Sequence, residues 1–180
     1  GDNNGSLKEY GIIYKQTDLD ENAMPDLATI AQMTAEIKPK LAFIQRSKGY
    51  LWRNALSIEE IAEIIEIIKT NSPSTIVVVD NCYGEFVDKK EPTEVGADVI
   101  VGSLIKNPGG GIAPTGGYVA GKREYIEQIS YRVTAPSLGN EVGSYTPGYR
   151  LYFQGLFLAP SVVKNALMGN TLAGYVFDRY

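Results

Sequence analysis

Two charged residues in this sequence stand where a chemical site could form. Asp80 directly follows the apolar run 76–79, and Lys106 comes shortly after a later apolar run, 99–101. Ser103 and the glycines 109–111 flank the lysine. A lysine amine condenses with an aldehyde, a carboxylate pairs with a protonated ring nitrogen, and a hydroxyl with backbone amides holds a phosphate. A pyridoxal phosphate site requires these three kinds of group.

Apolar periodicity predicts the elements that would position these residues. Helices alternate with continuous apolar runs, which predicts an α/β fold with a mostly parallel sheet and helices on both faces. Ligands of such sheets bind beyond the carboxyl ends of the strands, where Asp80 and the 103–106 loop fall. Ser57 and Glu60 form an expected capping box. We expect strands at 12–14, 41–44, 75–79, 98–101 and 118–120, and helices at about 25–37, 58–71, 123–131 and 160–179.

Composition narrows the function classes. The chain has 180 residues, of which 44% are hydrophobic and 21% charged, as in an ordinary globular domain. A net charge of -4 without a basic stripe argues against a nucleic-acid partner, and no apolar run is long enough to span a membrane. Histidine is absent and cysteine occurs once, which disfavours a metal site and a disulfide, and the single cysteine suggests a cytoplasmic protein.

Both ends of the sequence look internal to a longer polypeptide. It begins at Gly1 without an initiator methionine and stops at Tyr180 within an expected helix. We therefore expect residues 1–180 to be part of a larger protein.

Four segments carry a resemblance to a known family. The chain resembles the fold-type I (aspartate aminotransferase-like) pyridoxal phosphate enzymes along almost its whole length. Within them it is most similar to the methionine gamma-lyase-like group, also described as aluminium-resistance proteins and related to the lyases of Cys/Met metabolism. The matching segments are 43–50, 79–86, 103–111 and 153–160.

The resemblance implies a role for individual residues. Lys106 becomes the Schiff-base lysine, Asp80 the partner of the pyridine nitrogen, and Ser103 a phosphate ligand. A threonine common just before the lysine is Ile105 here. The asparagine that usually contacts the ring hydroxyl has no clear match, and Arg46 or its neighbour Gln45 takes that place. Burial beside the cationic cofactor would lower the pKa of Lys106.

Several residues keep a structural interpretation beside the functional one. Tyr83 either lines the cofactor pocket or packs, and Arg46 either contacts cofactor or substrate or has a structural role. Cys82 is expected to be a small buried residue. The glycines 109–111 and 116–117 either form turns or let the backbone approach the cofactor or a partner subunit.

The resemblance implies a lyase that acts on an amino acid and breaks a carbon–sulfur bond by β- or γ-elimination. The alternatives are another type I enzyme (an aminotransferase, aldolase or decarboxylase) and a non-catalytic domain that retains the fold. The resemblance makes residues 1–180 a partial pyridoxal phosphate-binding large domain, with an N-terminal segment and a small C-terminal domain lying outside it. It also implies a homodimer or homotetramer, with loop 135–149 near the interface and residues 156–158 anchoring that loop.

Overall fold

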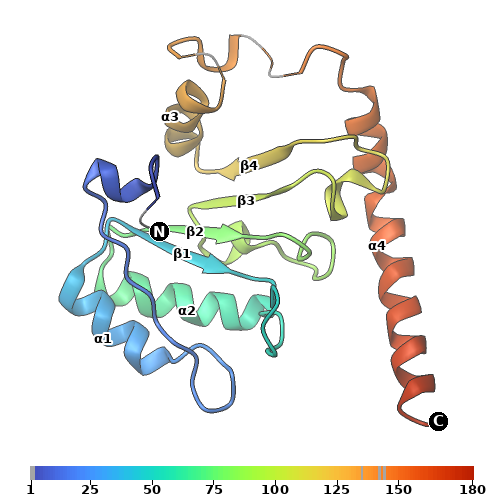
Figure 1. Ribbon diagram of the computed structural model, residues 1–180, viewed down its shortest axis with the longest axis horizontal. Helices are drawn as coiled ribbons and strands as arrows, with labels where there is room; N and C mark the ends of the chain where they lie inside the picture. The colour runs from blue at the N-terminus through green and yellow to red at the C-terminus, as the bar shows by residue number, and fades with distance from the viewer. Residues whose placement is uncertain (1–2, 135, 142, 144) are drawn as a thin grey trace.

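The centre of the molecule is a four-stranded sheet with the order β1-β2-β3-β4 (Figure 1). The computed structural model describes residues 3–134, 136–141, 143 and 145–180. β1, β2 and β3 are parallel, and β4 runs antiparallel to β3, so the prediction of a mostly parallel sheet is confirmed. The strands are β1 (Leu41–Gln45), β2 (Ile76–Asp80), β3 (Val99–Ser103) and β4 (Gly117–Gly121).

Helices connect and flank these strands. The predicted capping box is present at α2, where Glu60 N–H donates to the Ser57 hydroxyl and the Glu60 carboxylate accepts from Ser57 N–H. Asp26 caps α1 by accepting from Thr29 N–H at 3.0 Å. The α-helices are α1 (Leu27–Ile37), α2 (Ile58–Asn71), α3 (Arg123–Val133) and α4 (Arg150–Phe177). Short 3-10 helices are η1 (Leu7–Tyr10), η2 (Pro92–Val95), η3 (Asn107–Gly109) and η4 (Gly139–Glu141).

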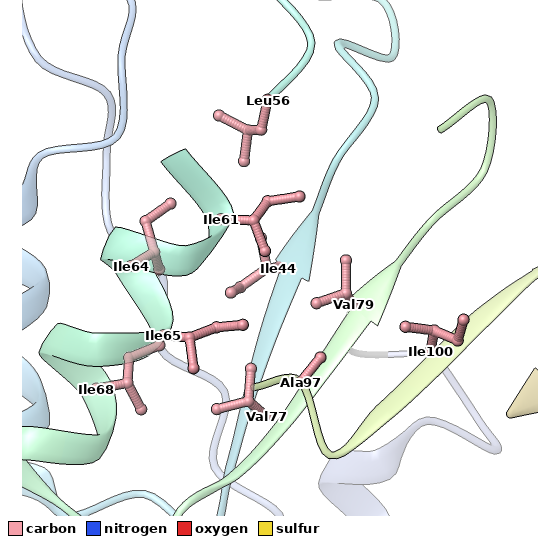
Figure 2. Close-up of a cluster of buried hydrophobic side chains, with 10 residues drawn as sticks. All are labelled: Ile44, Leu56, Ile61, Ile64, Ile65, Ile68, Val77, Val79, Ala97 and Ile100. Atoms are coloured by element: carbon pink, nitrogen blue, oxygen red, sulfur yellow. The ribbon is translucent and has the colours of Figure 1, made fainter. Parts of the chain in front are cut away.

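The core lies between α2 and one face of the sheet (Figure 2). Isoleucines at three- and four-residue steps give α2 a single apolar stripe, which meets the strand residues that point toward it. Burying each such side chain contributes about 1.5–3 kcal/mol. The buried cluster consists of Ile44, Leu56, Ile61, Ile64, Ile65, Ile68, Val77, Val79, Ala97 and Ile100.

The opposite face of the sheet is more open at β1. Leu41 and Phe43 point away from α2, because neighbouring residues of a strand alternate between faces, and they are 50% and 58% exposed. Helices were expected on both faces of the sheet. At β1 they cover only one face, the one on which α2 and α1 lie. At β1, the described residues leave the other face bare.

A cluster of charged side chains stabilises the sheet at the amino end of β3. Asp98, directly before β3, is 1% exposed and pairs with Lys69 of α2 and with Lys122, each at 2.6 Å. Its carboxylate also accepts from Val77 N–H of β2 at 2.8 Å. One carboxylate thus joins α2, β2, β3 and the start of α3.

Two predicted elements differ from the structure. Residues 12–14 form no strand, and Ile13 and Tyr14 remain 82% and 78% exposed, so apolar character alone misled the prediction. The last helix begins at Arg150 and contains Pro160, which the sequence suggested as its start. The part of the chain that the structure describes contains no helix long and apolar enough to cross a membrane.

Candidate active site

Asp80 and Ser103 lie on the same face of the sheet, at the carboxyl ends of neighbouring strands. Asp80 is opposite Val101 in the β2–β3 ladder, and Ser103 follows two residues after Val101. The period of two along a strand therefore turns both side chains away from α2. This placement agrees with the edge at which the sequence predicts the site.

Lys106 closes this edge from the loop after β3. Its Nζ lies 4.3 Å from the centre of the Tyr83 ring, a cation–π contact. Partial burial pushes the pKa of Lys106 down, but a hydrogen bond with Cys82 and the nearby Tyr83 and Asp80 outweigh it, so the pKa is raised. The direction is opposite to the one expected beside a cationic cofactor, because the groups that surround Lys106 here are acidic.

Tyr83 adopts a backbone conformation that large side chains rarely take. Its φ is +68°, and Phe86 in the same loop has a φ of +62°. Such left-handed residues are uncommon outside glycine and concentrate at functional sites. The unusual turn brings the Tyr83 ring, which is 60% exposed, to the ammonium group of Lys106.

Cys82 lies closer to the site than the sequence suggested. The residue is half-buried, and its N–H donates to the Asp80 carboxylate at 3.0 Å. Burial and Asp80 raise the pKa of the Cys82 thiol, and Lys106 offsets only part of that rise. The neutral thiol is therefore favoured. Because only the thiolate is a good nucleophile, Cys82 acts here as a hydrogen-bonding neighbour of Lys106.

A hollow of about 260 Å³ adjoins Cys82 and Tyr83. Its wall combines the loop after β2 with the segment that leads into α2. Tyr83 on this wall also contacts Lys106, so the hollow adjoins the lysine. The lining residues are Arg46, Ser47, Ala55, Leu56, Ser57, Cys82, Tyr83, Gly84, Val87 and Asp88.

Arg46 is only 3% exposed, and its guanidinium bonds to the loop after β2 and, through Nε, to the Leu56 carbonyl at 3.3 Å. Its guanidinium donates to Asn81 Oδ1 at 2.8 Å, to the Gly84 carbonyl at 3.1 Å and to Asp88 at 2.5 Å. A Cβ at Gly84 would lie 2.3 Å from an Arg46 nitrogen, so the loop wraps closely around the side chain. These contacts favour the structural interpretation of Arg46, and its cofactor contact remains a prediction.

The glycines after Lys106 approach a helix of the same chain. A Cβ at Gly110 would lie 2.3 Å from the Gly155 carbonyl oxygen, and one at Gly155 would lie 2.2 Å from the Gly109 carbonyl oxygen. Here the glycine backbone packs closely against α4 of the same chain, and its approach to the cofactor or to a partner subunit remains a prediction. Gly155, Ala159 and Val163 are the buried residues of α4.

The 135–149 segment was expected near a subunit interface. Residues 135, 142 and 144 lie outside the described residues. Tyr145, Tyr149 and Tyr152 contact one another, with ring centres 5.2–6.2 Å apart. Phe157 is 85% exposed, and the anchoring of the loop by residues 156–158 remains a prediction.

Sequence reasoning missed a buried acid beside the site. Glu85 is 4% exposed and accepts from the Tyr118 hydroxyl at 2.7 Å. A glutamate in a loop is ordinarily solvated, so its position among turn residues gave no sign of burial. Its only signal was membership of the matched segment 79–86.

The donor set fits a pyridoxal phosphate group. Within the described residues, no salt bridge joins Asp80 to Lys106, and neither forms an ion pair elsewhere. A carboxylate and an amine thus occupy one edge of the sheet without an ion pair to a described residue. Ser103 adds a hydroxyl on the face of Asp80. This edge of the sheet thus carries an acid that suits a ring nitrogen, an amine that suits an aldehyde and a hydroxyl that suits a phosphate.

Comparisons with known proteins point in the same direction. The sequence model of a family described as methionine gamma-lyase matches residues 1–180. YnbB, an uncharacterized protein of Bacillus subtilis (strain 168), is 49% identical over 171 residues, which are 94% of this chain and 40% of that protein.

Solved structures extend the comparison. A carbon-sulfur lyase involved in aluminum resistance from Clostridium novyi NT is 54% identical, with a TM-score of 0.86, over 93% of this chain and 40% of that one. The pyridoxal-5'-phosphate dependent protein YhfS from Escherichia coli is 20% identical, with a TM-score of 0.64, over 93% of this chain and 42% of that one, and shows the fold alone. The present chain thus spans about two-fifths of the length of these relatives.

Proposed function

We propose a function on the premise that this chain belongs to the methionine gamma-lyase family. The chain forms part of a pyridoxal phosphate-dependent lyase that cleaves a carbon–sulfur bond of an amino acid. The observation that carries the proposal is the pair Asp80 and Lys106, which share one sheet edge without forming a salt bridge. The similarity to the Clostridium novyi carbon-sulfur lyase supports the reaction class.

The side chains divide the task of holding the cofactor. Lys106 would attach the aldehyde, Asp80 would pair with the ring nitrogen, and Ser103 would contribute to the phosphate site. Tyr83 borders the same space through its ring. Bound pyridoxal phosphate supplies a ring that withdraws electrons from the substrate α-carbon.

Lys106 would also serve as the base of the reaction. With a substrate bound, its free amine would take the α-proton, and that proton would then be available to the departing sulfur. Asp80 would hold its negative charge toward the ring nitrogen and so favour the protonated ring. The sulfur-bearing group would leave the β or γ carbon as a thiol.

Trapping of the cofactor tests the assignment of Lys106. Whole protein incubated with pyridoxal phosphate is reduced with borohydride, digested and mapped by mass spectrometry. We expect the pyridoxyl group on Lys106, and we expect Lys106→Arg, which keeps the charge but cannot condense, to lose the label. A label on another lysine, or none in the unaltered protein, would refute the assignment.

The reaction class needs a separate measurement. An amino-acid panel assayed for both keto acid and thiol distinguishes a carbon–sulfur lyase from the two alternatives. Keto acid without thiol favours an aminotransferase, and neither product together with absent cofactor binding favours a non-catalytic domain. The keto acid itself identifies whether the β or the γ carbon loses its substituent.

Assembly and location complete the proposal. We infer a homodimer or homotetramer located in the cytoplasm, without a nucleic-acid or membrane partner. Exposed aromatic and aliphatic side chains along α4, such as Phe153 at 71% and Phe157 at 85%, support an interface there.

A further inference from the structure

A cluster of buried polar groups lies beneath the candidate site, on the face of the sheet that packs against α2. Glu85 and Tyr118 cover Gly102 of β3, because a Cβ at Gly102 would lie 2.5 Å from Glu85 Oε1 and 2.5 Å from a Tyr118 ring carbon. Gly102 directly precedes Ser103. The cluster therefore touches the strand that carries the site from the opposite side.

The Glu85 side chain has one defined partner. Tyr118 donates its hydroxyl to Glu85 Oε1 at 2.7 Å, and Asn81 lies 3.5 Å from the same hydroxyl. Glu85 Oε2 is buried and has no hydrogen-bond partner among the described residues. Burial raises the pKa of Glu85, and Glu91 adds to the rise, while Tyr118 and Arg46 oppose it. Burial without a full set of donors favours the neutral acid, so an ionic role is disfavoured.

The Glu85 backbone points the other way, toward the lysine loop. Its carbonyl oxygen accepts from Asn107 Nδ2 at 3.0 Å. Asn107 follows Lys106 directly and begins η3. Glu85 is thus bonded to β4 through its side chain and to the lysine loop through its backbone.

Arg46 holds the beginning of the loop after β2, the loop that contains Glu85. Its bonds to Asn81 and to the Gly84 carbonyl hold the turn that leads into Glu85. Tyr83, inside that turn, contacts Lys106. The loop after β2 and the lysine loop therefore meet at Lys106. Glu85 belongs to the first of these loops and bonds both to the sheet and to the lysine loop.

We propose that Glu85 is a positioning residue, which holds its own carbonyl against Asn107 by anchoring to Tyr118 and thereby fixes Lys106 against Tyr83. The importance of that placement rests on the proposed function. The placement itself is a property of the chain that can be measured without cofactor.

Hydrogen exchange of the cofactor-free whole protein tests the inference. In Glu85→Ala, losing the buried anchor should speed exchange in segment 104–110 by about tenfold, with α2 unchanged as an internal reference. Tyr118→Phe keeps the ring but removes the donor, and it should give the same selective effect. Glu85→Gln keeps a neutral group with an oxygen for Tyr118 and should stay close to the unaltered protein. Glu66→Gln, at an exposed position of α2, is the matched control.

Two results would overturn the inference. One is unchanged exchange at 104–110 in both Glu85→Ala and Tyr118→Phe. The other is equal acceleration in 104–110 and in α2, which would indicate a general stabilising role. A second readout, the yield of borohydride-trapped cofactor on Lys106, should fall in the same two variants. Failure of all trapping in the unaltered protein would count against the proposed function, and the exchange result would still decide the role of Glu85.

Discussion

The residues around Lys106 set its protonation. Cys82, Tyr83 and Asp80 together raise the pKa of the amine above its ordinary value, despite the opposing effect of burial. An amine must be neutral to condense with an aldehyde, so the isolated chain holds Lys106 in its less reactive form. A cationic ring beside it would reverse that balance by repelling the ammonium form.

Replacing Cys82 should therefore make Lys106 more reactive. In cofactor-free Cys82→Ala, the hydrogen-bond partner is lost and the pKa of Lys106 should fall toward its ordinary value. Labelling of Lys106 by an amine-reactive reagent should then rise at lower pH than in the unaltered protein, with exposed Lys164 as the reference residue. Identical labelling curves for Lys106 in both proteins would contradict this account.

Asp80 should matter for turnover more than for cofactor retention. Asp80→Asn removes the negative charge opposite the ring nitrogen, and we expect kcat to fall on the order of a thousandfold, as for loss of a preorganised electrostatic contact. The cofactor should remain attached through Lys106 and its phosphate. Steady-state kinetics and absorbance measure the two effects, with Asp18→Asn in an exposed loop as the control. Turnover near that of the control would remove Asp80 from the mechanism.

At the scale of elements, the Asp98 cluster holds the strands and helices in register. Burial alone would raise the pKa of Asp98, but hydrogen bonds from Lys122 and Lys69 lower it overall. A lowered pKa means that the folded state favours the charged form. The stabilisation is therefore present above the ordinary aspartate pKa and is lost as the pH falls through the lower value in the folded chain.

Asp98→Asn should weaken the fold and flatten its acid dependence. Losing charge-assisted hydrogen bonds to the two lysines should cost about 1.5–3 kcal/mol at neutral pH. Urea unfolding at several pH values measures the change, and Asp178→Asn at the exposed end of α4 is the control. If both variants keep the acid dependence of the unaltered protein, another group is responsible for it.

The contact between α4 and the lysine loop can be tested within one helix. Gly155→Ala would force a Cβ against the Gly109 carbonyl, and we expect a loss of about 1–3 kcal/mol. At Gly169, on the same helix, a Cβ would meet nothing within 4 Å, so Gly169→Ala should gain up to about 1 kcal/mol from helix propensity. Chemical denaturation compares the two. A stabilising Gly155→Ala would show that the close approach is not maintained in solution.

At the scale of the molecule, apolar surface along α4 supports self-association. We expect the whole protein to sediment as a dimer or larger. Phe157→Asp should shift it toward smaller species, because the side chain is 85% exposed in one chain. Asn170→Asp, also exposed on α4, adds the same charge without removing an apolar group. A monomer that is active in solution would refute the assembly.

The 180-residue segment alone should bind cofactor poorly. It spans about two-fifths of the length of its relatives, and the resemblance places further phosphate ligands outside it. Cofactor titration of the segment beside the whole protein measures the difference. Equal affinity would mean that Asp80, Ser103 and Lys106 suffice.

Periodicity in the sequence correctly predicted four of the five expected strands and the main helices, because burial against α2 imposes a strict spacing of isoleucines. It failed at residues 12–14, where apolar residues stay in contact with solvent and pair with no strand. The predicted ends of the strands indicated where Asp80, Ser103 and the loop with Lys106 would lie. The burial of Arg46 and Glu85 was not predictable, since it depends on how one loop folds back over the sheet.

The Gly109–Gly155 contact has a mechanical consequence. From Gly155 to the end of α4 at Phe177, the helix rises about 33 Å. The contact lies near the start of α4, at Gly155 and Ala159, so most of the helix extends beyond it. A displacement of the start of α4 would therefore move the lysine loop directly.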